Sequence, residues 1–210
     1  MAFMVGFDLD MTLVDSRDGI TFTIEKVLEE LNIKVPREEI FQTIGIPLWD
    51  AFAMWMSPEQ IDPAVVRYRE VYKKIGIPIT TVMPGTRESL AAIHKAGGRT
   101  MVVSAKIVGA VQIIVDLLKL PIDVVRGDLF AEAKAGALLE ESAVIYVGDH
   151  TADVRGARAA GAFAVAVSTG PCTADELRAE GADVVLVDLT AFPAWFETWI
   201  ARNPRVASPG

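Results

Sequence analysis

The chain has 210 residues, of which 51% are hydrophobic and 23% charged, a composition typical of a globular protein of one or two domains with a sizeable core. Its formal net charge of -8 argues against nucleic acids and membrane surfaces as partners, because both require clustered Lys and Arg. The only cysteine, Cys172, excludes an intramolecular disulfide, and no apolar run approaches the ~20 residues that span a bilayer. We therefore expect a cytoplasmic enzyme or binding protein.

The chain begins with a short apolar run that ends in two acids. Val5, Gly6 and Phe7 are typical of a buried strand, and Asp8 and Asp10 follow them. Side chains alternate along a strand, so both carboxyl groups point to the same side if the strand geometry persists. Two carboxylates that close require a bound cation, a shared proton or a nearby basic side chain, although such a pair can also cap a turn.

Residues 16–82 predict helices and no strand. Apolar residues between Ile20 and Leu31 recur every three or four positions, and Pro36 is suited to start the next helix. An apolar, aromatic segment follows at 48–56, and a further helix begins near Pro58 or Pro63 and ends at Gly76. We interpret 16–82 as a small helical domain inserted into a core made of residues 1–15 and 83–210.

Helices and short apolar strands alternate after residue 83, which predicts a parallel sheet covered on both faces. The expected strands after the first are 100–104, 122–126, 143–149, 163–167 and 184–187. Helices are expected at 86–96, 107–118 and 151–160, the aromatic segment 192–200 packs on the core, and 203–210 is a frayed tail. The predicted fold class is α/β, a Rossmann-like doubly wound parallel sheet with an inserted all-helical domain.

Polar residues stand where three of the predicted strands end, and ligands of such sheets bind beyond that edge. Asp8, Ser104 and Asp149 occupy these positions, and Asp153 lies one helical turn after Asp149. Grouped carboxylates suit a hard cation such as magnesium. Ser104 and Asp153 are also ordinary residues for a helix start.

A lysine is needed to balance the acids, and the sequence offers two candidates. Lys134 and Lys106 both satisfy the charge requirement, and spacing does not choose between them.

The run DLDMTLVDS resembles the first motif of the haloacid dehalogenase superfamily of phosphohydrolases, normally DxDGTLxDS, and the other elements follow in that family's order. The helical insertion resembles the cap of the phosphoglycolate phosphatase-like branch, and MPGTRESLAAIHKAG is similar to the segment with which that branch re-enters its core. Met11 replaces the usual glycine, and Ala135 stands where this branch commonly has proline.

The resemblance implies a role for each candidate residue. Asp8 is the nucleophile that forms an aspartyl phosphate, and Asp10 is the general acid and base. The implied ligands of Mg2+ are the Asp8 carboxylate, the Asp10 backbone carbonyl and Asp149, with Asp153 close behind. The implied phosphate-binding residues are Ser104, Ala105 and Lys134, so the resemblance prefers Lys134 to Lys106.

The implied substrate is a small phosphorylated metabolite. Phosphoglycolate is the leading candidate, and a nucleotide, pyrophosphate or sugar phosphate is the alternative. Asp10 favours a phosphate ester over a halide, because a halide leaves without being protonated. Specificity is expected around residues 45–55, although these apolar side chains suit the inserted domain's own core better. A phosphomutase of the β-phosphoglucomutase type and a non-enzymatic phospho-aspartate regulatory module remain alternatives, as do monomer and homodimer.

Overall fold

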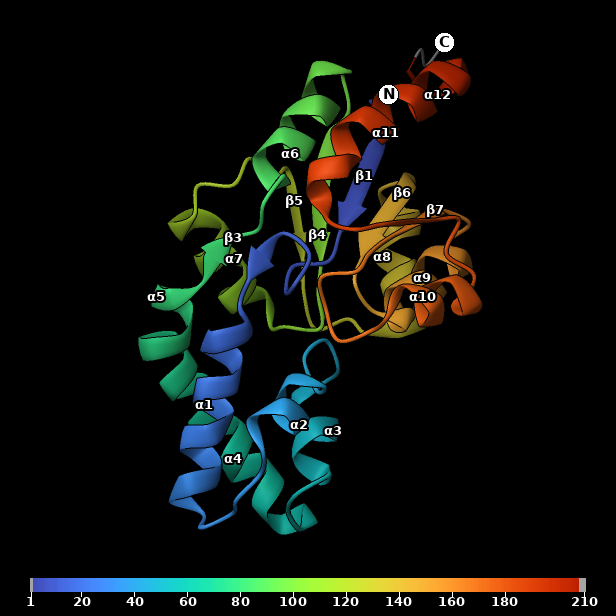
Figure 1. Cartoon of the computed structure of the whole chain (residues 1–210). Helices are drawn as coiled ribbons and strands as arrows, with labels where there is room; N and C mark the ends of the chain where they lie inside the picture. The colour runs from blue at the N-terminus through green and yellow to red at the C-terminus, as the bar shows by residue number, and fades with distance from the viewer. Residues whose placement is uncertain (1, 208–210) are drawn as a thin grey trace.

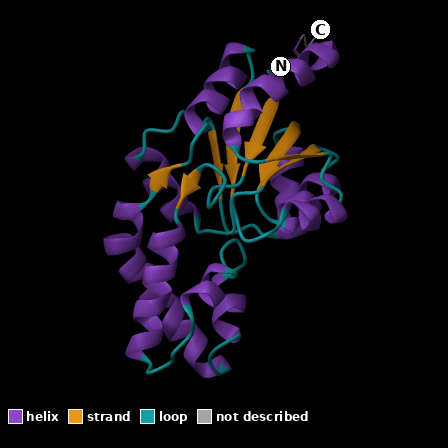
Figure 2. Cartoon of the chain, viewed as in Figure 1, coloured by secondary structure: helices purple, strands orange, loops and turns teal. Residues whose placement is uncertain are grey.

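The core of the molecule is a six-stranded sheet in which all neighbouring strands are parallel (Figures 1 and 2). The structure is a computed structural model that describes residues 2–207. The strand order is β5-β4-β1-β6-β7-β8. The strands are β1 (Met4–Phe7), β4 (Arg99–Val103), β5 (Val124–Arg126), β6 (Ala143–Gly148), β7 (Phe163–Val167) and β8 (Val184–Leu186). The predicted doubly wound α/β fold is confirmed, with β1 at the centre of the sheet.

Helices cover both faces of this sheet (Figure 1). They are α6 (Thr86–Lys95), α7 (Val108–Leu117) and α11 (Phe192–Arg202) on one face, and α8 (Lys134–Glu140), α9 (Thr151–Ala159) and α10 (Ala174–Glu180) on the other. Val5 and Phe7 pack into the first layer, whereas Met4 packs into the second. Alternate residues of β1 thus enter opposite cores, which is why the strand is apolar throughout.

The segment between β1 and α6 is largely helical and lies beyond the carboxyl edge of the sheet (Figure 1). It contains α1 (Arg17–Glu30), α2 (Arg37–Phe41), α3 (Leu48–Ala53), α4 (Pro58–Val71), the π-helical turn η1 (Tyr72–Gly76) and α5 (Ile77–Ile79). The loop between α2 and α3 turns back toward the sheet, and Gly45 in this loop lies against the His150 ring. No helix among the described residues is long and apolar enough to cross a membrane.

Two details of this segment differ from the sequence prediction. The final helix continues past Gly76 to Ile79, because Pro78 lies in the first turn of α5, where the missing N–H group costs no hydrogen bond. The expectation of no strand within residues 16–82 is wrong, because β3 (Thr81–Val82) pairs antiparallel with β2 (Val14–Asp15), which lies just before this range. Strands this short give no periodicity from which they could be predicted.

The C-terminal part also differs in two places. Helix α10 was not predicted, although Thr173 and Glu176 form a reciprocal capping box at its start. The expected tail contains the short helix α12 (Pro204–Ala207), so the prediction of a frayed end is wrong there. Its last residues, 208–210, lie outside the described part of the chain.

Candidate active site

Three side chains reach the carboxyl edge of the sheet because each directly follows a central strand. Asp8 follows β1, and its backbone N–H continues the ladder by donating to the Val147 carbonyl at 2.8 Å. Ser104 follows β4 and Asp149 follows β6. The two strands adjacent to β1 are β4 and β6, so the fold brings all three residues to one side of the molecule.

Lys134 is the centre of the charge network at this edge. Its ammonium group donates to Asp8 Oδ1 at 2.7 Å, to Asp153 Oδ1 at 2.6 Å and to the Tyr146 hydroxyl at 2.9 Å. The Tyr146 hydroxyl in turn donates to the Val103 carbonyl at 2.7 Å. All three donors of the ammonium are used, so Lys134 holds Asp8 in one position.

Burial controls the ionisation of these groups. Removal from water raises the pKa of Asp8 to about 7, and Asp153 and Asp10 add to the increase, while Lys134 opposes it. Burial together with Asp153 and Asp8 also raises the pKa of Asp149 well above its ordinary value. Burial disfavours the charge of Lys134, yet its two carboxylate partners hold its pKa well above the usual range. The single positive charge of Lys134 is therefore too small to balance the carboxyl groups around it if all of them are ionised.

The donor set fits a hard cation. Asp8, Asp149 and Asp153 each offer one carboxylate oxygen, and these three oxygens lie within 4.8 Å of one another. Thr12 Oγ1 donates to Asp149 Oδ1 at 2.8 Å, while the buried Asp149 Oδ2 has no hydrogen-bond partner. Gly170 leaves space beside that oxygen which a Cβ atom would fill. Carboxylate oxygens in such a set suit magnesium, and a bound cation would satisfy the unpartnered oxygen.

Asp10 has a second lysine as its partner. Lys106 Nζ lies 3.4 Å from Asp10 Oδ2 and 4.1 Å from the centre of the Tyr72 ring, which comes from the helical segment. Asp10 Oδ1 is buried without a partner. Both lysines that the sequence offered thus serve the site, Lys134 beside Asp8 and Lys106 beside Asp10. Asp8 and Asp10 line the same cavity, although β1 ends at Phe7 and the strand geometry on which the prediction depended does not extend to Asp10.

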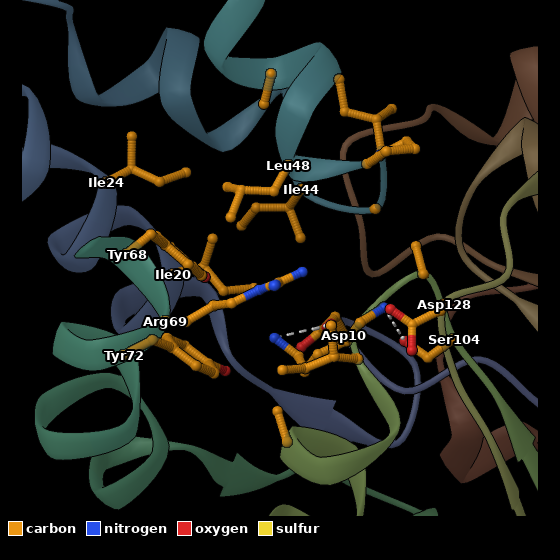
Figure 3. Close-up of a pocket in the computed structure, with 18 of the residues that line it drawn as sticks. Asp10, Ile20, Ile24, Ile44, Leu48, Tyr68, Arg69, Tyr72, Ser104 and Asp128 are labelled. Atoms are coloured by element: carbon orange, nitrogen blue, oxygen red, sulfur yellow. Dashed lines mark hydrogen bonds and ion pairs between the residues drawn. The ribbon is translucent and has the colours of Figure 1, made fainter. Parts of the chain in front are cut away.

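A cavity of about 380 Å³ opens between this edge and the helical segment. Its floor includes Asp8, Asp10 and the Ser104–Ala105–Lys106 turn, where the Ser104 hydroxyl accepts from the Lys106 N–H at 3.2 Å. The walls and roof are mainly apolar side chains of the helical segment (Figure 3). They include Ile20, Ile24, Ile44, Ile46, Pro47, Leu48, Trp49 and Tyr68. The cavity thus has both carboxylates and a lysine at its floor, while its walls and roof are apolar.

Segment 45–55 divides between two roles. Gly45, Leu48 and Trp49 line the cavity, as expected for a specificity region. Phe52 is fully buried and lies edge-on to Tyr68, with 6.3 Å between the ring centres, so it belongs to the core of the helical segment. The expectation that these apolar side chains pack in the core of the helical segment holds for Phe52 but not for Leu48 and Trp49, which line the cavity.

Several residues at this site were not identified from the sequence. Thr12 contacts Asp149 at the site. The only sequence feature that could have identified it is its position two residues after Asp10, within the DLDMTLVDS run. In the sequence, Tyr146 is indistinguishable from the apolar residues of its buried strand. Tyr72 likewise has the position of a core residue in a helix. Their contacts with Lys134 and Lys106 depend on tertiary packing. His150, which follows Asp149, caps α9 by accepting the Ala152 N–H at 3.0 Å.

The fold and the site define the class first: a doubly wound α/β protein with a buried carboxylate cluster at the carboxyl edge of its sheet. Residues 5–167 match the model of the haloacid dehalogenase-like hydrolase family. The chain belongs to this family.

Similar proteins agree with this assignment. The chain is 30% identical to "Probable phosphatase IndB" of Dickeya dadantii, covering 87% of this chain and 88% of the relative. It is also 30% identical to phosphoglycolate phosphatase of Rhodospirillum rubrum, over 90% of this chain and 88% of the relative. Among solved structures, a haloacid dehalogenase-like hydrolase from Streptococcus pneumoniae matches with a TM-score of 0.83 and 26% identity, covering 93% of this chain and 98% of that one.

Proposed function

We propose that the chain is a magnesium-dependent phosphatase that hydrolyses a small phosphomonoester, with phosphoglycolate as the leading substrate. The observation that carries the proposal is the buried Asp8, fixed by Lys134 at the floor of a cavity that also holds Asp10. Relatives named as phosphatases, one of them a phosphoglycolate phosphatase, support the reaction class. In this proposal residues 16–82 form a cap over a core of residues 1–15 and 83–210.

The residues perform a two-step transfer in this mechanism. A carboxylate oxygen of Asp8 attacks phosphorus, the bond to the leaving oxygen breaks, and an aspartyl phosphate forms. Asp10 donates a proton to the leaving oxygen and then takes one from the water that attacks the aspartyl phosphate. Because Asp10 lies beside Lys106 and has one unpartnered oxygen, it is available for this proton transfer.

The same network stabilises the charge that develops on the phosphoryl group. Lys134 contributes a buried ammonium, and the Ser104 hydroxyl with the Ala105 backbone offers hydrogen bonds from the adjacent strand end. When bound, Mg2+ supplies positive charge at the phosphoryl oxygens, and Asp8, Asp149 and the Asp10 carbonyl, with Asp153 behind them, would hold it.

The test is a phosphate-release screen of small phosphoesters with and without magnesium. We expect metal-dependent release with turnover, and loss of turnover in Asp8→Asn, because an amide is a poor nucleophile for phosphorus. Circular dichroism of the variant checks that the fold is retained.

Three other outcomes would contradict the proposal. Retained turnover in Asp8→Asn would exclude the assigned nucleophile. Transfer of the phosphoryl group to a second hydroxyl of a sugar phosphate would identify a mutase. A stable, stoichiometric phospho-Asp8 without turnover would identify a regulatory module.

A further inference from the structure

Arg69 is a cation of the cavity that the proposed chemistry does not use. It lies in the last turn of α4, and its side chain extends into the cavity between Ile20 and Asp10 (Figure 3). The phosphoryl group is already served by Lys134, Ser104 and the metal ligands. Arg69 therefore has another role, on the apolar side of the chamber.

The guanidinium group of Arg69 is held in place by its neighbours. It stacks over the Trp49 ring, with 5.0 Å from its carbon to the ring centre. Trp49 is fixed in turn, because its Nε1 donates to Asp62 Oδ1 at 2.8 Å. Stacking uses the face of a guanidinium and leaves its N–H edge free, so Arg69 is oriented before any ligand arrives.

Arg69 also has no acidic partner in the described part of the chain. No ion pair or side-chain hydrogen bond joins it to a carboxylate there, whereas Arg67 in the same helix binds both oxygens of Glu30 at 2.8 Å. A half-buried guanidinium among apolar walls favours an anion, and a carboxylate matches the two-donor edge and single charge of arginine.

We propose that the leaving group of the substrate carries a carboxylate, which Arg69 binds, while its carbon chain contacts the apolar wall formed by Ile20, Ile44 and Leu48. This inference rests on the proposed phosphatase function and narrows the substrate class to carboxyalkyl or carboxyaryl phosphates. Phosphoglycolate is the shortest member of that class. The size and apolar lining of the chamber also accommodate longer members.

The experiment compares esters that differ only in charge at the far end. Phosphoglycolate and longer carboxyalkyl phosphates are each paired with the corresponding neutral amide, and kcat/KM is measured with magnesium present. For every pair that the native enzyme hydrolyses, we expect a higher kcat/KM for the acid than for the amide. Arg69→Gln should reduce that acid-to-amide ratio about tenfold to hundredfold, the value of a charge-assisted hydrogen bond.

Two variants give the controls. Arg67→Gln removes the same charge from the same helix on its exposed side, and we expect an unchanged acid-to-amide ratio. Arg69→Lys keeps the charge without the two-donor edge and should give an intermediate ratio. Thermal unfolding of each variant verifies that the fold is intact.

The outcomes separate this inference from the proposed function. Equal turnover of acid and amide by the native enzyme, or an acid-to-amide ratio unaffected by Arg69→Gln, would overturn the inference and leave the phosphatase assignment standing. A preference for bisphosphates over every carboxylate ester would likewise overturn the inference without affecting the phosphatase assignment. Absence of magnesium-dependent phosphate release from every ester would contradict the phosphatase assignment and the inference with it.

Discussion

Met11 occupies a backbone conformation that favours glycine, directly after the two acids of the first motif. Its φ is 58°, in the left-handed region, and its side chain is fully buried in the core. The Met11 N–H donates to the Val14 carbonyl at 2.9 Å, and its own carbonyl accepts from Thr169. The tight turn after Asp10 is thus kept, and methionine provides core volume that glycine would not.

We predict that Met11→Gly destabilises the protein by about 2 kcal/mol, the difference between the midpoints of two opposing effects. Loss of a buried methionine side chain costs about 2–5 kcal/mol, while relief of the left-handed conformation returns about 1–2 kcal/mol. Urea unfolding measures the difference, and Met11→Leu, which keeps the volume, should lose less than about 1.5 kcal/mol. Equal stability of Met11→Gly and native protein would show that the side chain contributes nothing net.

At the level of single residues, the sequence predicted which acids gather at the site, whereas its spacing did not choose between Lys134 and Lys106, both of which contact these acids. Each of three polar residues, Asp8, Ser104 and Asp149, follows a buried strand. Because parallel strands end at the same edge of a sheet, the sequence positions were enough to predict that these side chains lie close together. Arg69 and Tyr72 could not be predicted. Arg69 lies in the last turn of α4 and Tyr72 in the π-helical turn η1 that follows it, and the contacts of both side chains depend on how these elements face the sheet.

Helix α1 and the turn η1 approach each other closely because two glycines meet. A Cβ atom at Gly19 would lie 2.6 Å from the Gly76 carbonyl oxygen, and a Cβ at Gly76 would meet the Tyr72 ring. This contact joins the first and last parts of the helical segment, and Tyr72 carries it onward to Lys106. The packing of the segment therefore bears on the position of Asp10.

We predict that Gly19→Ala destabilises the protein by about 1–3 kcal/mol, because the methyl group has no space. Gly136→Ala is the matched control. Gly136 is likewise the third residue of a helix, but a Cβ there meets nothing within 4 Å, so the helix should gain about 0.5–1 kcal/mol. Chemical denaturation of both variants compares them. A stabilising effect of Gly19→Ala would contradict the close approach.

The strands of the central sheet and the longer helices were predictable, whereas the two-residue strands were not. The sheet strands and α1, α4, α6 and α9 have clear periodicity and end signals. By contrast, β2 and β3 have two residues each, and their pairing depends on tertiary contacts. Helix α10 had a usable signal in the spacing of Thr173 and Glu176, which form its capping box.

For the whole molecule, the buried acidic site links the protonation of its carboxyl groups to stability. The folded, metal-free protein holds Asp8 at a pKa of about 7, against 3.8 as the reference value. Between these two values the folded state binds more protons than the unfolded state, so this group's contribution to stability decreases as the pH rises. Asp149 acts in the same direction.

We predict that magnesium offsets this loss and that its stabilising effect increases from pH 5 to pH 8. The metal requires deprotonated carboxylates, so protons compete with it at low pH. With magnesium at about a hundredfold excess over Kd near pH 8, the gain of about 2.7 kcal/mol corresponds to an increase in Tm of about 5–10 °C. Differential scanning calorimetry with magnesium or with chelator measures it. A Tm shift independent of pH would contradict the assigned ligands, and Asp149→Asn should reduce the shift.

The two short strands β2 and β3 have a consequence for how such proteins diversify. The chain leaves the sheet domain through Val14–Asp15 and returns through Thr81–Val82, and these residues are paired side by side. The two ends of the helical segment are therefore neighbours in space. An insertion with adjoining ends can be lengthened, shortened or exchanged without moving any strand of the sheet. The side chains of this segment that line the apolar walls of the cavity can consequently change while the strand ends that carry Asp8 and Asp149 stay in place.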